Sequence, residues 1–516
     1  MIRRLLSKRF VRILLCFFIT LVTLVVLLYV WTNWSGRRRW AATKAMIEHE
    51  GETLDHLSLL PVTPAAAQNL LAIEPLDGIT DTVDHDEAKG APGAKRQALA
   101  ALNLEAKAPA SSGVDKGEMP DMQAWAKFLR ETKYLDLPAE SPTPGKEILA
   151  ALDVKFPVLK QLADLAPQRS QAMFTPGLRE RELPEMLFSL SLRHYTAAQS
   201  LVRALCLRAR AAIDAGQGVE AARSLLAAQK IGLACESEPL LIGLLVGNSA
   251  ETQANEGIWL GLRERAFPDA DLRLLHQLLS THDLDKALLQ ACRGEMAFGL
   301  NVLEYLQDAA AGRKKVDQGV ASLFGRDQQS LYRSAMLVPG GLFDHWKSVI
   351  AEQEWKHMIN PLRKGGIAAA VKSAEGMNTE MQEKHNLVLH PDYIMARLVV
   401  PALSHVSATV LFVQARERQA LAAIALERFY LKHARYPAAL QELVPEFTTA
   451  VPLDPCDGKQ VRYRTTPAGR YQLWCVGMDG KDDDGEIKKN GVPMKSPDYR
   501  GDWTWQYEPV KKDSKK

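Results

Sequence analysis

An acidic loop near the C-terminus is the densest group of potential ligand side chains in the sequence. Residues 479–486 read DGKDDDGE, so five carboxylates and two glycines lie within eight residues. Calcium binds about six to eight oxygen ligands, and closely spaced carboxylates on a glycine-containing loop can supply them. The spacing is not that of an EF-hand, because Lys481 stands where a ligand is needed. The pattern therefore predicts either a structural, non-catalytic calcium site at Asp479, Asp482 and Asp484 or a solvated acidic turn.

Two of the six cysteines flank a predicted β-hairpin. Cys456 and Cys475 lie within a stretch of twenty residues, and in an oxidising compartment they could form a disulfide that stabilises a small module. Two free thiols are the alternative, because the geometry that a disulfide needs cannot be read from a sequence. The other cysteines lie in apolar segments and are expected in the membrane or the core: Cys16, Cys206, Cys235 and Cys292.

No catalytic motif occurs in the sequence. There is no His-Glu-x-x-His zinc motif, Gly-x-Ser-x-Gly elbow, phosphate-binding Gly-Lys-Ser/Thr loop or Cys-x-x-Cys pair. The twelve histidines are scattered, and His276 and His282 lack the four-residue helical spacing of a metal pair. The net charge is only +3 with acids and bases mixed, which argues against nucleic acid as the main partner. Nothing in these patterns favours an enzyme.

An uncharged run near the N-terminus is long enough to cross a membrane. Ile13–Trp31 contains nineteen residues without a charge, and at ~1.5 Å per residue such a helix spans a hydrocarbon core of about 30 Å. Trp31, Trp34 and Trp40 lie where an interfacial aromatic belt is expected. A cleaved signal peptide is the alternative, but its apolar region is usually shorter, and no small-x-small cleavage site directly follows the run. Residues 13–31 are therefore expected to contact membrane lipid as an uncleaved signal-anchor.

The basic residues around this run predict its orientation. Five of them precede the run within residues 1–12, whereas Arg37, Arg38 and Arg39 follow it. By this small excess the positive-inside rule favours a cytoplasmic basic tail, 1–12, and a body on the outer side. The expected location is a single pass through the inner (cell) membrane with a periplasmic body.

Composition divides the chain beyond the span. Residues 37–60 have a helical pattern and are expected to form a solvated juxtamembrane helix. Residues 61–119 are rich in Ala, Pro, Gly and Asp, which predicts a flexible linker. Helical periodicity dominates residues 120–413 and predicts a large helical domain. The apolar run 398–413 is too short and too polar for a second span, so a core helix is expected there.

One segment of the helical domain is patterned as a helical hairpin. In Thr196–Leu233, apolar stripes lie on both sides of Gly216-Gln217-Gly218, as in a tetratricopeptide repeat. Only this copy is convincing, and a solenoid needs about three or more units. An irregular bundle with one such hairpin is expected, and its exposed faces suit protein binding better than chemistry.

Residues 414–505 are expected to form a small α+β module, followed by a basic tail at 506–516. Apolar spacing predicts a long helix that ends near Ala434. Alternating residues at 461–465 and 471–475, separated by a Pro-Gly turn, predict a β-hairpin. The predicted fold class is mostly α: a transmembrane helix, a large helical bundle, and a module with an antiparallel sheet.

Three segments of the module follow one another in the order FYLKHARYPAALQELVPEF, VPLDPCDGKQVRYR and GRYQLWCVGMDGKDDDGE. This series resembles the globular domain of the major pseudopilin of type II secretion systems, over roughly the last hundred residues. The resemblance implies a long helix, a small antiparallel sheet and a calcium ion in the acidic loop. The matching positions are Tyr436, Pro437, Asp454, Pro455, Gly458, Tyr463, Gly477, Asp479 and Gly480.

Two pseudopilin features are missing at the N-terminus. The chain has no Gly-Phe processing site, and residues 13–31 contain no acid where the family has a glutamate. Processing and packing into a pseudopilus are therefore not expected. The whole chain resembles uncharacterised bacterial membrane-anchored envelope proteins that carry this module at the C-terminus, a resemblance that implies no activity.

The expected function is a membrane-anchored extracytoplasmic scaffold or protein-interaction protein, linked by resemblance to type II secretion or pilus-like machinery. The sequence does not identify its protein partner. The alternative is an envelope enzyme or processing factor, which a pocket with convergent carboxylates or histidines in the helical domain would favour. A third hypothesis, a true pseudopilus subunit, predicts a shortened N-terminus in an intact-mass measurement.

Calcium added to the purified protein is expected to bind and to raise its melting temperature, because a ligand that binds only the folded state stabilises it. Isothermal titration and a thermal scan measure the two effects. The absence of both would contradict the calcium site.

The proposed disulfide between Cys456 and Cys475 predicts that two more thiols react with a labelling reagent after reduction than before it. The count is made by mass spectrometry on denatured protein. Equal counts before and after reduction would show that the two thiols are free.

Overall fold

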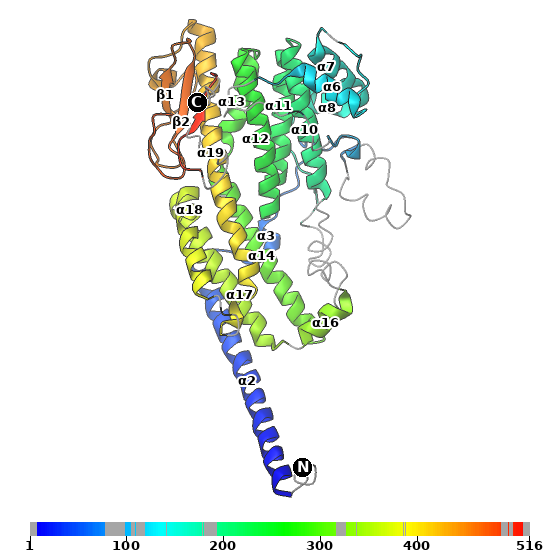
Figure 1. The fold of residues 1–516 in the computed structure, drawn as a ribbon, viewed down its shortest axis with the longest axis vertical. Helices are drawn as coiled ribbons and strands as arrows, with labels where there is room; N and C mark the ends of the chain where they lie inside the picture. The colour runs from blue at the N-terminus through cyan, green and yellow to red at the C-terminus, as the bar shows by residue number, and fades with distance from the viewer. Residues whose placement is uncertain are drawn as a thin grey trace, which may run out of the picture.

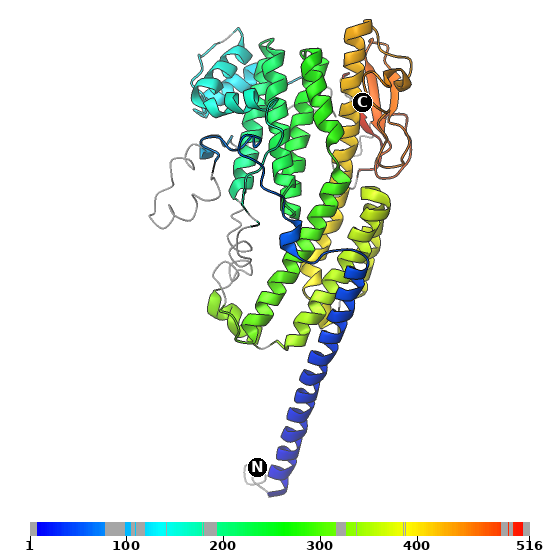
Figure 2. The same ribbon diagram turned by 180° about the vertical axis from the view of Figure 1, so that it is seen from behind.

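The computed structural model describes residues 8–77, 99–104, 109, 119–140, 142–177, 179, 193–315, 327–336, 338–384, 386, 389–486, 494 and 499–508. They form an elongated, mostly helical molecule with one small sheet (Figure 1). A long helix projects from the helical body at one end, and the sheet lies toward the opposite end (Figure 2). The predicted fold class is confirmed: a long apolar N-terminal helix, a helical bundle and a small C-terminal antiparallel sheet.

The projecting helix, α2, runs without a break through Lys8–His49. It is the one helix among the described residues that is long and apolar enough to cross a membrane. The separate juxtamembrane helix expected over residues 37–60 is wrong. No proline separates the apolar run from the polar residues after it, and Gly36 lies inside the helix, so one helix continues to His49. The turn after it contains Gly51, whose φ of +82° lies in the left-handed region. The short α3 (His56–Leu59) follows.

The polar end of α2 packs against α17 (Gly340–Glu354). Gly36 and Gly341 lie so close that a Cβ on either would overlap backbone atoms of the other helix. The Asn33 side chain also accepts a hydrogen bond of 2.6 Å from the backbone N–H of Gly341. This bond satisfies one of the N–H groups that the start of a helix leaves without an intrahelical partner.

Charged and apolar contacts between α2 and the body continue along the helix after Gly36. The Arg39 guanidinium bonds the Glu352 carboxylate at 2.8 Å, and the Thr43 hydroxyl donates to the same carboxylate at 2.7 Å. Ile47 is fully buried in the body. One face of residues 37–49 therefore packs on the body, through Arg39, Thr43 and Ile47, whereas most of the other side chains of this segment are exposed, as their charges predicted.

The helices of the body bury one continuous apolar core. They are α6 (Met122–Glu131), α7 (Pro144–Lys155), α8 (Pro157–Leu165), α10 (Arg193–Asp214), α11 (Gly218–Glu236), α12 (Leu241–Arg263), α13 (Asp269–Thr281), α14 (Leu284–Ala310), α16 (Gln328–Met336), α17, the π-helix η2 (Trp355–Ile359), α18 (Asn360–Glu383), the 3-10 turn η3 (Pro391–Tyr393) and α19 (Ala396–His433). The predicted hairpin is α10 and α11, joined at Gly216, whose φ is +70°. α12 packs against both of its helices.

The first part of the expected linker is packed against the body. Leu70, Leu71 and Leu76 are almost completely buried. The Asn69 amide donates to the carbonyl oxygen of Met173 at 3.0 Å. Leucines at 70, 71 and 76 give this segment enough apolar surface to bury, so residues 61–77 are not a spacer; most of residues 78–118 lie outside the described residues.

α19 belongs to both the body and the C-terminal module. It contains the run 398–413, and its described side chains there, such as Leu403 and Val410, are fully buried, as expected of a core helix. The boundary predicted at 413/414 therefore falls inside one helix, because no glycine or proline near it breaks the helix. The helix ends at His433, as predicted.

A three-stranded antiparallel sheet packs on the end of α19. β1 (Arg462–Thr465) pairs with β2 (Tyr471–Cys475), which confirms the predicted hairpin. β2 also pairs with β3 (Trp503–Trp505), whose residues are all buried. The 3-10 turn η4 (Leu440–Leu443) lies between α19 and β1. Residues 506–508 of the expected basic tail are described, and residues 509–516 lie outside the described residues.

Gly36→Ala is expected to destabilise the protein by about 1–3 kcal/mol, because the new methyl group meets the α17 backbone and forces the two helices apart. Thermal unfolding in detergent measures the effect. Gly299→Ala in α14 is the matched control: its methyl group would meet no atom within 4 Å, so it should be neutral or stabilise by up to about 1 kcal/mol. Equal effects of the two changes would contradict the close packing.

Candidate functional site

The acidic loop predicted to bind calcium is arranged around a buried anion. The Asp502 carboxylate is fully buried and accepts hydrogen bonds from the backbone N–H groups of Gly485, at 2.7 Å, and Asp483, at 3.0 Å. Burial raises the pKa of Asp502 to about 6, against the lowering effect of these two hydrogen bonds. At this point the loop therefore directs backbone N–H groups toward its interior, whereas a calcium ion needs oxygen ligands there.

The predicted ligands themselves are partly engaged elsewhere. Asp482 bonds the Arg462 guanidinium at 3.2 Å and the Trp474 indole N–H at 2.9 Å. One Asp479 oxygen accepts from the backbone N–H of Lys481. Asp479, Asp482 and Asp484 do not form a compact ligand group among the described residues. Calcium binding at this loop stays a prediction.

Cys456 and Cys475 lie near each other around Asp454 as free thiols in this structure. Cys475 is fully buried and Cys456 is half-buried, and burial raises the pKa of both thiols. The backbone N–H of Cys456 donates to the Asp454 carboxylate at 2.9 Å. The predicted disulfide between them stays a prediction.

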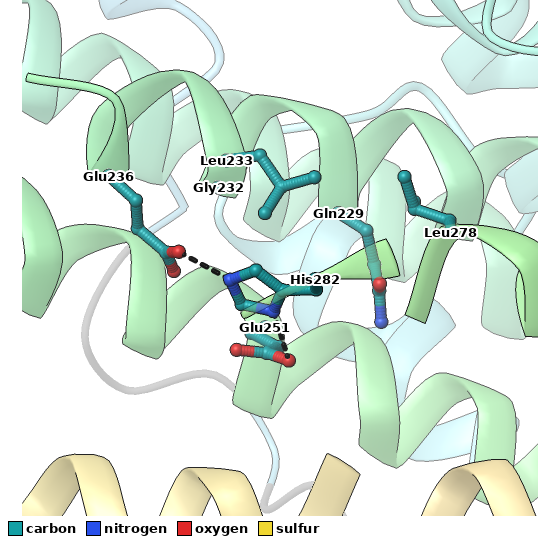
Figure 3. Close-up of a pocket in the computed structure, with 7 residues that line it drawn as sticks. All are labelled: Gln229, Gly232, Leu233, Glu236, Glu251, Leu278 and His282. Carbon is teal, nitrogen blue, oxygen red and sulfur yellow. Dashed lines mark hydrogen bonds and ion pairs between the residues drawn. The ribbon is translucent and has the colours of Figure 1, made fainter. Parts of the chain in front are cut away.

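A cluster of ionisable side chains that the sequence did not suggest lies inside the helical body. It consists of one imidazole and three carboxylates, from Glu236, Glu251, His282 and Glu417, and we call it the His282 cluster. Glu236, Glu251 and His282 form the one group of potential metal ligands among the described residues in which one ligand atom from each lies within 4.8 Å of the others. Figure 3 shows the imidazole between Glu236 and Glu251.

Four helices supply the cluster. Glu236 ends α11, Glu251 lies in α12, His282 is the residue directly after α13, and Glu417 lies in α19. α11 and α12 approach closely because Gly247 has no side chain: a Cβ there would overlap the Glu236 side chain. These four residues are distant in sequence, so only the packing of the bundle brings them together.

The two nitrogens of the imidazole face different carboxylates. Nε2 of His282 lies 2.8 Å from Oε2 of Glu236, which is hydrogen-bond distance. Nδ1 lies 3.5 Å from Oε1 of Glu251 and 3.6 Å from Oε2 of Glu417. Neither carboxylate of this second pair has a hydrogen-bond partner in the described part of the chain.

Burial makes these charges costly. Glu236, Glu251 and Glu417 are 6%, 4% and 0% exposed, and only 8% of the His282 side chain is exposed. Burial raises the pKa of Glu236, and it raises that of Glu417 to about 7; in both cases the neighbouring imidazole opposes the rise. Burial disfavours the imidazolium of His282 as well, but the Glu251 charge and the bond to Glu236 outweigh it and raise its pKa.

A small cavity touches the cluster and adjoins a larger groove. The cavity has a volume of about 10 Å³ and is lined by Glu236, Glu251 and His282 together with Leu233 and Leu278. That is room for about one water molecule. The same two leucines also line an open, largely apolar groove of about 390 Å³, bounded on its other side by residues 61–64 and 170–173. The cluster can therefore hold a proton or a small cation, whereas its cavity is too small for an organic substrate.

One signal in the sequence, on which no prediction was based, would have indicated part of this cluster. The apolar stripe of α19 steps through Val410, Val413, Ala420 and Ile424, and Glu417 occupies the step between the second and third of these. An acid on a core stripe is seldom buried without a partner. No comparable pattern marked His282, which follows the end of a helix.

Comparison of the chain with protein-family models, with curated proteins and with solved structures finds no match. Any function must therefore be argued from the chain's own residues.

The buried Asp502 carboxylate predicts a pH dependence of stability. Its pKa is about 6 in the folded protein and about 3.9 in an unfolded chain. The folded state therefore binds the proton of Asp502 more tightly than the unfolded chain does. The stability that this proton adds is complete below pH ~4 and is lost as the pH rises through about 6. Between these pH values the melting temperature of the native protein should fall more than that of Asp502→Asn. Parallel pH profiles would contradict the prediction.

Proposed function

We propose that this protein is a membrane-anchored extracytoplasmic scaffold that binds a protein partner through its C-terminal module. In this proposal residues 13–31 cross the inner membrane, the tail 1–12 is cytoplasmic, and the body lies in the periplasm. The module is pseudopilin-like, and the partner belongs to type II secretion or pilus-like machinery.

The observation that carries this proposal is the continuity of α2 from the apolar run into the body. Asn33 lies two residues beyond the predicted span and already bonds α17 through Gly341. The bidentate bond between Arg39 and Glu352 follows within two helical turns. Such an anchor holds the body against the membrane surface in a defined orientation, which suits a scaffold better than a freely tethered enzyme.

The position of the sheet supports a binding role for the module. In both views it lies toward the end of the body opposite the N-terminus of α2 (Figures 1 and 2). β1 is an edge strand of the sheet, and its residues Arg464 and Thr465 are exposed. An exposed edge strand offers unpaired backbone groups to which an extended segment of another protein can add.

The second candidate function, an envelope enzyme, is favoured by the convergence of carboxylates and an imidazole at the His282 cluster. Such groups can act as general acids and bases. The cavity at the cluster, of about 10 Å³, has no room for an organic substrate, and the groove beside it is separated from the cluster by Leu233 and Leu278. The scaffold is therefore the better supported proposal.

A photo-crosslinking amino acid at Arg464 in β1 is expected to give a discrete adduct in living cells with a component of a secretion or pilus-like system. Mass spectrometry identifies the partner. The same amino acid at the exposed Lys127 of α6 is the control and should not give that adduct. If no position on β1 gives an adduct that the control lacks, the proposed role of the module is wrong.

A further inference from the structure

We propose that the His282 cluster is a binding site for one divalent transition-metal ion. Nδ1 of His282 and the carboxylates of Glu251 and Glu417 are the ligands. Glu236 does not bind the metal in this arrangement; it accepts the hydrogen bond from Nε2 and orients the imidazole. The site does not depend on the proposed scaffold function.

The bond to Glu236 decides which nitrogen can bind a metal. A neutral imidazole carries its proton on one ring nitrogen, and a carboxylate 2.8 Å from Nε2 holds the proton there. The raised pKa of His282 keeps a second proton on Nδ1 in the metal-free protein. A metal ion would displace that proton to solvent, and the lone pair of Nδ1 would then point toward Glu251 and Glu417. Metal-bound histidines commonly use their other N–H to bond a carboxylate in this way.

The spacing around Nδ1 suits a metal ion better than it suits hydrogen bonds. Metal–nitrogen and metal–oxygen bonds of about 2.0–2.2 Å in a tetrahedral site place neighbouring ligand atoms ~3.4 Å apart. Oε1 of Glu251 and Oε2 of Glu417 lie 3.5 and 3.6 Å from Nδ1. Both separations exceed the usual length of an N–H···O hydrogen bond. The compact ligand group among the described residues is Glu236, Glu251 and His282, so Glu417 would have to move toward Glu251 to complete the coordination.

Unpartnered oxygens provide a second, independent indication of a ligand. Both oxygens of Glu251 and both of Glu417 are buried, and none accepts a hydrogen bond from the described residues. Buried carboxylates are normally hydrogen-bonded, paired or bound to a metal, because an isolated buried charge is very costly. Here the two carboxylates share one ion-pair partner, the His282 imidazole, and leave their hydrogen-bonding capacity unused. Glu251 also lines the cavity of about 10 Å³, which can hold the water that completes the coordination.

A cation would offset the negative charge of the cluster. With all three carboxylates ionised, one imidazolium leaves two excess negative charges in the core, and the raised pKa values of Glu236 and Glu417 show that the metal-free cluster takes up protons instead. A dication with a neutral imidazole leaves one, and this charge lies on Glu236, whose bond to the imidazole is retained. The metal would also tie α12 and the end of α13 to α19, the helix that carries the sheet.

The donor set identifies the class of metal. One imidazole nitrogen with two carboxylates suits Zn²⁺, Mn²⁺ or Fe²⁺, whereas Ca²⁺ and Mg²⁺ prefer oxygen ligands alone. Leu233 and Leu278 line both the cavity and the open groove of about 390 Å³, so only these two side chains would have to move to open an entry path. Rotation of these two side chains would connect the site to solvent.

The test uses the full chain, purified in detergent and stripped with a chelator. One equivalent of Zn²⁺ should bind and raise the melting temperature, and Ca²⁺ should not compete with it. Glu251→Gln and Glu417→Gln should each weaken Zn²⁺ binding more than about 100-fold. Glu236→Gln should weaken it by about 10–100-fold, the usual effect of losing a carboxylate that orients a metal-bound histidine.

Two control variants separate this site from other carboxylates. Glu427→Gln removes another buried acid of α19, which bonds Tyr436 outside the cluster. Asp484→Asn removes a charge from the acidic loop. Neither change should alter Zn²⁺ affinity. The proposal is overturned if the unmodified protein binds no Zn²⁺ or Mn²⁺, or if the glutamine variants of Glu251 and Glu417 bind as tightly as it does.

A spectroscopic measurement decides the matter if the glutamine variants do not fold. Co²⁺ added to the stripped, unmodified protein should give visible d–d absorption of a site with nitrogen and oxygen ligands, and Zn²⁺ should displace it. A spectrum identical to that of aqueous Co²⁺ would overturn the proposal, because it would show that the ion stays in solution.

Discussion

The close contact between α2 and α17 is the constraint on which the arrangement of the molecule depends. At Gly36 and Gly341 the two backbones meet without side chains between them, and the Asn33 amide completes the first turn of α17. Because α2 is one uninterrupted helix, the direction of the apolar run fixes the direction of the whole body. The body therefore begins directly where the span is predicted to end.

α19 connects the helical body to the sheet at the opposite end of the molecule. It passes through the core of the body and continues as the helix on which the sheet packs. Arg416 donates a hydrogen bond to the carbonyl oxygen of Thr504 in β3, and Gln419 donates one to that of Trp503, at 2.5 Å. Glu417, between these two residues, points into the His282 cluster instead. One short stretch of α19 thus contacts both the sheet and the buried charges, so a ligand in the cluster would be coupled to the support of the module.

The sequence predicted those helices and strands whose buried residues repeat with the spacing of that helix or strand itself. The uncharged run 13–31, the hairpin around Gly216, the end of α19 and the strands β1 and β2 all came from spacing within one segment. The continuity of α2 was missed because the charges at 37–49 suggested solvation, whereas Arg39 is paired with Glu352 on a helix three hundred residues away. β3 was not predicted, since a three-residue strand carries too little alternation to be recognised.

The candidate site could not be predicted from the pattern of any one segment, because its contacts also join residues that are far apart in the sequence. Its residues come from four helices, and each is unremarkable in its own segment; only Glu417 interrupts an apolar stripe. Conversely, the acidic loop had the densest carboxylates in the sequence, yet its backbone donors converge on Asp502. Density of acids along the chain did not show which carboxylates the fold brings together around one imidazole.

We propose that α2, which is long and apolar enough to cross a membrane, anchors a body on the outer side of that membrane. Single cysteines at the exposed Lys364 of α18 and at Ser7 before the span, each introduced into a chain without its reactive native thiols, test it on intact spheroplasts with a membrane-impermeant maleimide. The account predicts that the cysteine at 364 reacts without lysis and that the one at 7 reacts only after the membrane is opened. Labelling of position 7 alone in intact spheroplasts would contradict it.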